Sequence, residues 1–562
     1  MSKNFTFNNT PVLRYRRSQF DLSHGVKLSM NIGDLVPFEL QEVYAGDTFK
    51  VNTACVSRLT SQFFRPIMDN LFLDVYYFYV PSRLLYDKFV NVFGENTESA
   101  WANTVEYETP SIYPSAGSDT NPLVSQGTVA DYLGLPVGRL GRGDISILPF
   151  RAFAKIYNEW FRDQNNVAPM HIQKGESVAS ERLNNNAWAS NNYTGKLPKV
   201  AKFHDYFTSA LPAPQKGSAV DISISGFDDV PVYTSSQFTS FSTGSPLSLR
   251  SLGGSQTIGL DYSLGYRVMD SGPSDLSRSS TSVGSNVYSP SNGVAPANLW
   301  AHTSDLSPIP FTVNDLRFAF QYQKMLERDA RSGTRYVEYL ASHFGVSAGD
   351  YMLQRSEFLG GRRSPLSVTQ VTQTTGSDSD SSPLAQVGAF SASNSRSRFT
   401  KGFVEHGYVL GVCCIRQFHT YQQGIERFWT RKKRTDYYDP VFAHIGEQPV
   451  YRSELYGLDK NTADSVFGYN EAWADLRQRP SRISGQMRTG VSNSLDIWHL
   501  GDYYQNAPTL TPDFIQETPD NLNRAITVPS TSQDQFILDF YIQNIAYRTL
   551  PTYSVPSLID HD

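Results

Sequence analysis

The chain is poor in charge and in cysteine, and it has no long apolar run. Charged residues are 18% of its 562 residues, against roughly 25% in an average soluble protein. Its cysteines, Cys55, Cys413 and Cys414, are too few for a disulfide framework, so we expect small buried hydrophobes in a reducing compartment. Without an apolar leader or a membrane-length run, neither secretion nor membrane insertion is predicted.

Lysine and glutamate are missing from a long internal stretch. No lysine lies between residues 216 and 324, and no glutamate lies between residues 181 and 327. Residues 217–307 are instead rich in serine, glycine, threonine and proline, a composition that also fits a flexible linker. Strand-like pieces recur within this stretch, at 232–233, 257–262 and 266–269. Because a disordered linker would lack them, we predict a β-rich surface insertion.

Aromatic residues are abundant, at 13% of the chain. The most aromatic strand pattern is 70–81, which ends at a proline that cannot continue a ladder. Since this strand is apolar on both faces, it must be covered on both faces, by a second sheet or by a neighbouring chain. Many aromatics with little lysine and glutamate are typical of protein interfaces, although a large β-rich core would give the same composition.

Strand patterns at both ends of the chain predict one domain that draws its sheets from distant segments. Residues 35–40 and 48–56 alternate around a turn at 45–47, which predicts a hairpin. Further strands are expected at 403–421 and 535–548. Antiparallel strands separated by long loops predict a mainly β fold, a single eight-stranded antiparallel jelly roll with large helical and loop insertions.

Helical periodicity is clearest at 148–163, where one apolar stripe repeats every three to four residues. Helices are also predicted at 312–329, at 336–344 and around 82–106, whereas 374–399 is expected to be a plain loop. The chain then divides into four parts. These are a basic arm at 1–30, strands and helical insertions at 31–216, a surface insertion at 217–307, and a helical insertion, loops and remaining strands at 308–562.

No catalytic, metal-binding or phosphate-binding motif is found in the sequence. His406, His419 and His444 are neighbours in sequence but lack the spacing of metal ligands. Asp228 and Asp229 are the only adjacent acidic pair in the insertion, and a polysaccharide hydrolase would need such carboxylates in a cleft. We therefore predict no enzyme activity, no metal and no cofactor.

Three basic clusters stand out in a chain of net charge −5. Aromatic pairs at 428–429 and 437–438 flank one of them. Cations interleaved with rings suit single-stranded nucleic acid, because phosphates take the charge and bases stack on the rings. A solvated loop, or a basic patch that meets an acidic neighbour, would give the same pattern. The predicted DNA-contact residues are Arg14, Arg16, Arg17, Arg431, Lys432, Lys433, Arg434, Arg477, Arg479 and Arg482.

Short blocks along the whole chain resemble the major capsid protein of microviruses, most closely in the gokushovirus branch. The blocks occur in the order of that family and run from near the start of the chain to near its end. They are Phe20-Asp-Leu-Ser-His24, Gly33-Asp-Leu-Val-Pro37, Gly46-Asp-Thr-Phe49, Met68-Asp-Asn70, Leu148-Pro-Phe-Arg-Ala152, His204-Asp-Tyr-Phe-Thr-Ser-Ala-Leu-Pro212, Pro214-Gln-Lys-Gly217, Glu327-Arg-Asp-Ala-Arg331 and Tyr547-Arg-Thr-Leu-Pro-Thr-Tyr553.

The resemblance implies a structural protein of a small bacteriophage. Sixty copies would form a T=1 icosahedral shell around circular single-stranded DNA, assembled in the bacterial cytoplasm with internal DNA-binding or scaffolding phage proteins. By position, residues 217–307 would form a protrusion at the three-fold axes that attaches to a host receptor. Adaptable tyrosine-rich surfaces suit such binding, and the candidates are Tyr233, Tyr262, Tyr266 and Tyr288.

A different class of function remains compatible with the residues alone. Jelly rolls with tyrosine- and tryptophan-rich loops also serve as carbohydrate-binding modules, so an oligomeric carbohydrate-binding protein is the alternative. Trp300 and the tyrosines of the insertion would then be the sugar-contacting residues.

Overall fold

The computed structural model describes residues 16–95, 107–112, 123–142, 145–175, 195–217, 313–333, 335–347, 349–366 and 393–553, with short strand segments between 232 and 301 and at 370–372 and 387–390. The chain splits into two compact units, each described by itself. The first joins Met1–Gly217 to Leu326–Asp562, and the second is Ser218–Met325.

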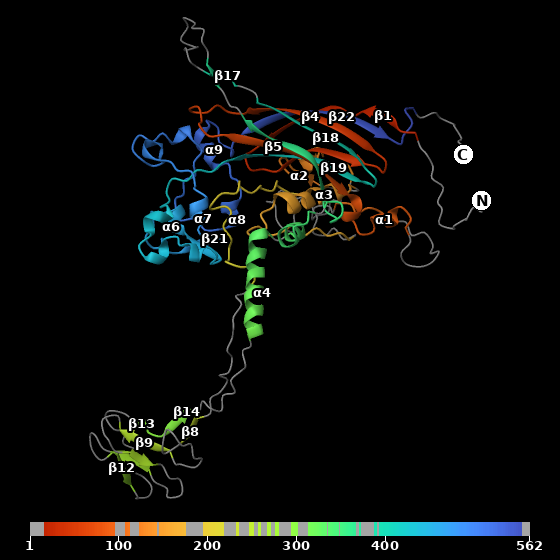
Figure 1. Cartoon of the computed structure of the whole chain (residues 1–562). Helices are drawn as coiled ribbons and strands as arrows, with labels where there is room; N and C mark the ends of the chain where they lie inside the picture. Colours follow the sequence, from red (N-terminus) through yellow and green to blue (C-terminus); the bar gives the residue numbers. More distant parts are fainter. Residues whose placement is uncertain are drawn as a thin grey trace, which may run out of the picture. The chain divides into compact units, whose positions relative to one another are not determined.

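Two antiparallel sheets form the body of the first unit and lie one above the other in Figure 1. The first sheet contains β1 (Ser18–Asp21), β2 (His24–Met30), β4 (Thr48–Leu59), β18 (Ser393–Gly402) and β22 (Phe536–Arg548). The second contains β3 (Val36–Val43), β5 (Leu71–Pro81), β15 (Glu357–Leu366) and β19 (Gly407–Gln417). The mainly β, antiparallel fold predicted from the sequence is therefore confirmed. The strands at 70–81, 403–421 and 535–548 are also found.

The core between the sheets is aromatic. Phe38 of β3 stacks on Phe540 of β22 with ring centroids 4.2 Å apart. Tyr77 of β5 packs against Phe399 of β18 and hydrogen-bonds Thr53 of β4 through its hydroxyl. Side chains alternate along β22, so that every second residue is buried in this core and the others are exposed. The first sheet thus has one apolar face and one face open to solvent.

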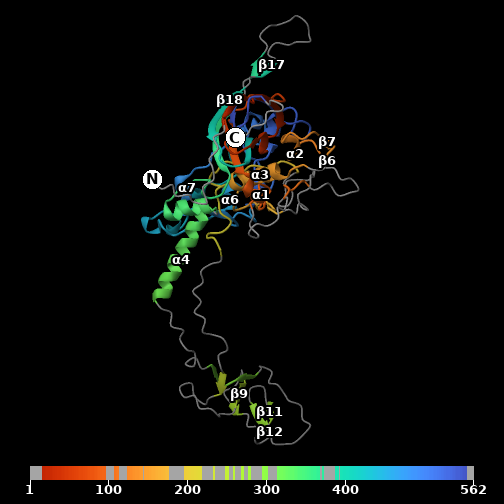
Figure 2. The ribbon, with the colours of Figure 1, turned by 90° about the vertical axis from the view of Figure 1, so that its right-hand side faces the viewer.

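In the second sheet β3, β5 and β19 are buried on both faces, whereas the edge strand β15 is partly exposed. The outer face of the sheet packs on α3 (Leu148–Ile156), whose apolar stripe includes Phe150 and Phe153, and Figure 2 shows this helix beside the sheet. The adjacent Cys413 and Cys414 of β19 point to opposite faces, the first into the inter-sheet core and the second toward α3. The double cover predicted for 70–81 is therefore supplied within the chain, by the other sheet and by a helix.

One carboxylate lies inside this apolar strand. Asp74 of β5 is fully buried, and its oxygens accept hydrogen bonds from Arg363 of β15, at 2.7 Å, and from Arg416 of β19. Because the two guanidinium groups come from the strands on either side of β5, one buried acid ties three neighbouring strands together.

Three predicted elements differ from the structure. The strands at 35–40 and 48–56 exist, but β3 pairs with β19 while β4 pairs with β18 and β22, so they lie in different sheets and form no hairpin. The described part of 82–106 holds only a 3-10 turn and the one-turn helix α1 (Phe89–Val92). The loop expected at 374–399 contains β17 (Val387–Phe390) and most of β18.

A lobe of short helices and turns lies at one end of the sandwich (Figure 1). Its core is built by 206–210 and by residues from 421 to 515. Its elements are β20 (Glu447–Tyr451), β21 (Val466–Glu471), α6 (Arg452–Leu455), α7 (Ala474–Arg477), α8 (Pro512–Ile515) and α9 (Asp520–Ala525). The first unit also contains α2 (Val129–Tyr132), α5 (Tyr336–Tyr339) and the strands β6 (Leu123–Val124), β7 (Gly138–Arg139) and β16 (Gln370–Thr372).

The second unit contains small antiparallel sheets, in which β9 (Ser248–Ser251) pairs with β10 (Thr257–Gly259) and β13 (Val294–Pro296). The other pairs are β8 (Val232–Thr234) with β14 (Leu299–Ala301), and β11 (Arg267–Asp270) with β12 (Leu276–Ser279). These strands confirm the β character predicted at 232–233 and, in their described parts, at 257–262 and 266–269. Along the chain, α4 (Val313–Ser332) follows them and confirms the helix predicted at 312–329. Among the described helices, none is long and apolar enough to cross a bilayer.

The buried acid of β5 gives a stability prediction. Asp74→Ala leaves the largely buried guanidinium of Arg416 without its carboxylate, which should reduce the free energy of unfolding by about 3–5 kcal/mol. Asp539→Ala is the matched control, because it breaks an exposed pair with Lys27, worth about 0–1 kcal/mol. Denaturant unfolding followed by tryptophan fluorescence measures both variants, and equal effects would contradict the structural role of Asp74.

Candidate nucleic-acid interface and a buried ionic cluster

The aromatic and basic segment at 427–442 is a series of 3-10 turns on the lobe. The carboxylate of Asp436 accepts hydrogen bonds from the backbone N–H groups of Lys432 and Lys433, and that of Asp439 caps the turn at Val441. The aromatic side chains of this segment point outward, and Trp429 is 71% exposed. Aromatic rings and cations are therefore both exposed in this segment, as the sequence pattern suggested.

The structure brings two of the predicted basic clusters together. Glu426, which precedes the cluster at 431–434, pairs with Arg479 and Arg482 of the cluster at 477–482. The N–O distance is 3.2 Å in both pairs. Arg431 pairs with Asp475, and Arg477 pairs with Glu471. Four of the predicted DNA-contact cations are thus paired with three neighbouring carboxylates. A cavity of 450 Å³ lies between the clusters and is lined by residues that include Trp429 and Arg482.

In the cluster at 431–434, three cations are exposed and have no ion pair among the described residues: Lys432, Lys433 and Arg434. In the arm, Arg16 and Arg17 are exposed just before β1, whereas Arg14 lies outside the described residues. Figure 1 shows β1 at the end of the sandwich away from α6 and α7, so the described end of the arm lies apart from the other two clusters.

Most of the receptor-binding candidates cannot be placed in the structure. Tyr233 lies in β8, in register with Trp300 of β14. Tyr262, Tyr266 and Tyr288 lie outside the described residues, as do Asp228 and Asp229.

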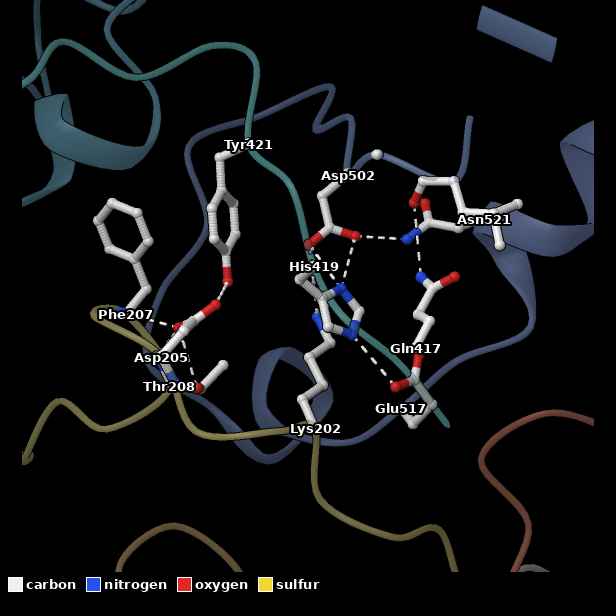
Figure 3. Close-up of polar contacts among 12 residues, drawn as sticks. Lys202, Asp205, Phe207, Thr208, Gln417, His419, Tyr421, Asp502, Glu517 and Asn521 are labelled. Carbon is white, nitrogen blue, oxygen red and sulfur yellow. Dashed lines mark hydrogen bonds and ion pairs between the residues drawn. The ribbon is translucent and has the colours of Figure 1, made fainter. Parts of the chain in front are cut away.

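A buried ionic cluster joins the lobe to the sandwich (Figure 3). His419, just beyond the end of β19, lies between two carboxylates. Its Nδ1 is 2.9 Å from Asp502 and its Nε2 is 3.1 Å from Glu517. Lys202 lies 4.0 Å from the same Asp502 carboxylate. Since both ring nitrogens face acceptors, the imidazole carries both protons and is an imidazolium.

The electrostatics of this cluster follow from burial and pairing. Burial alone would lower the pKa of His419, but the charges and hydrogen bonds of Asp502 and Glu517 outweigh it and raise the pKa to about 9. Burial would raise the pKa of Asp502, yet His419 and Lys202 hold it below its usual range. The sequence analysis found no metal-ligand spacing at His419, and it missed the carboxylate partners because they lie more than eighty residues further along the chain.

The geometry of this cluster indicates that it stabilises the fold. His419, Asp502 and Glu517 are almost fully buried, and the backbone around them links Asp502 to Thr420 and Glu517 to Val200. A histidine whose two nitrogens are both occupied has no free site to accept a proton from a substrate. No group of histidine, cysteine and acidic residues in the described part of the chain is arranged to hold a metal ion.

The raised pKa of His419 predicts a stability that falls in alkali. The contribution is complete below pH 6.5, the ordinary histidine value, and it is lost as the pH rises through about 9. A shift of this size corresponds to a loss on the order of 3 kcal/mol. Denaturant unfolding between pH 6 and pH 10 should show this decline in the wild type and in the exposed control His444→Gln, but not in His419→Gln. A decline that persists in His419→Gln would contradict the assignment.

Comparison with known proteins gives consistent matches over nearly the whole chain. The family model described as capsid protein (F protein) matches residues 9–558. Capsid protein VP1 of Spiroplasma virus 4 is 36% identical over 549 residues, covering 96% of this chain and 95% of that protein. Capsid protein VP1 of Chlamydia phage 1 is 36% identical over 607 residues, covering 98% and 97%. That of Bdellovibrio phage phiMH2K is 35% identical over 570 residues, covering 98% and 97%. As its sequence motifs predicted, the chain belongs to the capsid protein (F protein) family of the microviruses.

Proposed function

We propose that sixty copies of this capsid protein assemble into a T=1 icosahedral shell, with the sandwich as its wall. The observation that carries the proposal is an apolar surface on the lobe, exposed in the single chain. Its residues include Trp429, Tyr437, Val441, Leu458 and Leu476. Large apolar side chains left this exposed on one lobe indicate protein contacts, and neighbouring arginines that already have carboxylate partners fit the rim of an interface.

The sandwich itself fits an eight-stranded jelly roll. β1 and β2 both pair with β22 and follow one another along it, so they act as one interrupted edge strand. Counted in this way, each sheet has four strands, and together they give the eight of the proposed jelly roll. The strands of each sheet come from distant parts of the chain, as in Greek-key folds.

The second unit is proposed to be the protrusion at the three-fold axes that attaches to a host receptor. It is a compact unit of its own with small antiparallel sheets, which supports this role. On α4, which follows those sheets, Phe318, Tyr322 and Met325 form an exposed stripe at helical spacing. Such a stripe fits contact between copies. In this proposal the carbohydrate-binding alternative becomes one kind of receptor, a surface glycan.

The shell is proposed to enclose circular single-stranded DNA, with internal DNA-binding or scaffolding phage proteins as partners, and to assemble in the bacterial cytoplasm. Of the predicted DNA-contact residues, Lys432, Lys433 and Arg434 are exposed without an ion pair among the described residues. Arg16 and Arg17 in the arm are also exposed. These five support the proposal better than the four arginines that already have carboxylate partners.

Removing the apolar surface should block assembly without unfolding the subunit. Trp429→Ser with Val441→Ser alters side chains that are 71% and 83% exposed, and exposed substitutions shift stability by only about 0.5 kcal/mol. We expect the yield of closed particles, produced with the companion phage proteins, to fall about tenfold, since each lost apolar contact recurs in every subunit. Sedimentation and electron microscopy measure the yield. Normal particles from this variant would contradict the interface, and Lys460→Gln is the control.

Replacing residues 218–307 by a short glycine and serine linker tests the protrusion. We expect closed shells in normal yield and at least a tenfold loss of adsorption to host cells, because the receptor surface is removed while the sandwich is intact. A second variant, with Tyr233, Tyr262, Tyr266 and Tyr288 changed to serine, keeps the protrusion and tests the candidate residues. Unchanged adsorption of the linker variant would refute the attachment role.

A further inference from the structure

An open groove over the outer face of the first sheet and the neighbouring edge strand β15 of the second sheet carries four cations that no sequence motif indicated. Its volume is 1070 Å³, and its lining includes Lys50 of β4, Arg362 of β15, and Arg396 and Arg398 of β18. All four side chains are exposed. We call it the β4–β18 groove.

The register of the strands places these groups in rows. On β18, Arg396 and Arg398 face outward because Ser395 and Ser397 face the core. Asn52 lies opposite Arg398 on one side and opposite Gln543 of β22 on the other. The outer face of the sheet therefore presents guanidinium groups beside neutral amides, across three strands.

The groove has positive charge without local neutralisation. None of its four cations has an ion pair among the described residues, and none of the described residues that line it is acidic. The ammonium group of Lys50 lies 5.3 Å from the ring centre of Tyr547, a contact that leaves its charge in place. By contrast, the neighbouring Arg363 is paired with buried Asp74.

A chain of net charge −5 that gathers four unpaired cations in one groove needs an anionic occupant. In a shell, the same groove would recur in every copy, so that a polyanion lying along the wall would meet a series of such grooves. Guanidinium groups bind phosphate oxygens in a bidentate manner. Asn52 and Gln543 offer donors and acceptors to base edges.

We propose that the β4–β18 groove binds the phosphate backbone of the packaged single-stranded DNA. The amides beside the cations favour a nucleic acid over an acidic peptide, because base edges offer them both donors and acceptors. The inference rests on the proposed enclosure of DNA, and it adds a contact on a sheet face to the candidates in the lobe and the arm. It also fixes the direction of the sandwich, because this face then lines the interior of the shell.

The test uses a double variant that carries both Arg396→Gln and Arg398→Gln. Its control is a second variant with the same loss of charge, Lys196→Gln together with Lys460→Gln. Particles are made with the companion phage proteins, opened by heat, emptied with nuclease and titrated with a fluorescent single-stranded oligonucleotide at several salt concentrations. Each phosphate contact contributes about 0.7 to the slope of log K against log salt, so the double variant should lose a slope of about 1.4. Ultraviolet crosslinking of DNA in intact particles should label peptides from 357–366 and 393–402.

Oligonucleotide binding by the double variant equal to that of the control would overturn the proposal. So would normal DNA binding with a loss of shell yield confined to this variant, since the groove would then bind a protein partner. Failure of the wild type to form any shell would instead contradict the proposed function. In that case the oligonucleotide titration of the unassembled chain would still decide whether the groove binds DNA.

Discussion

The second sheet is covered on both faces, and the rest of the structure depends on this cover. β5 and β19 are apolar on both sides, so one face needs the first sheet and the other needs α3. The first sheet consequently packs its apolar face against the second sheet, and its polar face is open to solvent. Asp74 fits this arrangement only because two arginines from flanking strands satisfy it. The polar outer face is where the β4–β18 groove forms.

The lobe is held to this sandwich at the end of β19. His419 continues from that strand and meets Asp502 and Glu517, which the lobe and its connecting segments supply. A charged histidine between two buried acids gives the join a fixed geometry, at the cost of desolvating three groups. The surface of the lobe is then free for contacts. Its arginines are mostly paired with carboxylates and its aromatic side chains are exposed, which suits a protein partner better than DNA.

Sequence patterns predicted the strands and helices whose side chains repeat clearly. β5, β22, α3 and α4 were found where periodicity placed them. β18 was expected to be a loop, because Ser395 and Ser397 are its inward residues and its outward ones are arginines. Small polar side chains fit beneath β15, where the hydroxyls of Ser364 and Ser395 hydrogen-bond, so no apolar alternation marks this strand.

The sequence did not predict which distant segments pair with one another. The turn at 45–47 resembles a hairpin, but its Asp47 carboxylate accepts a hydrogen bond from the backbone N–H of Tyr44, and the chain there crosses from one sheet to the other. Likewise, Arg479 and Arg482 looked like free cations until the fold placed Glu426 beside them. The groove was missed for the same reason, since its cations come from three strands far apart in the chain.

Cryo-electron microscopy of assembled particles tests the central claim most directly. The account predicts an icosahedral map in which the exposed face of β4, β18 and β22 turns toward the interior, with density following the β4–β18 groove, and in which the surface around Trp429 is buried between copies. A map with that sheet face on the outside of the shell, or with Trp429 open to solvent, would contradict it.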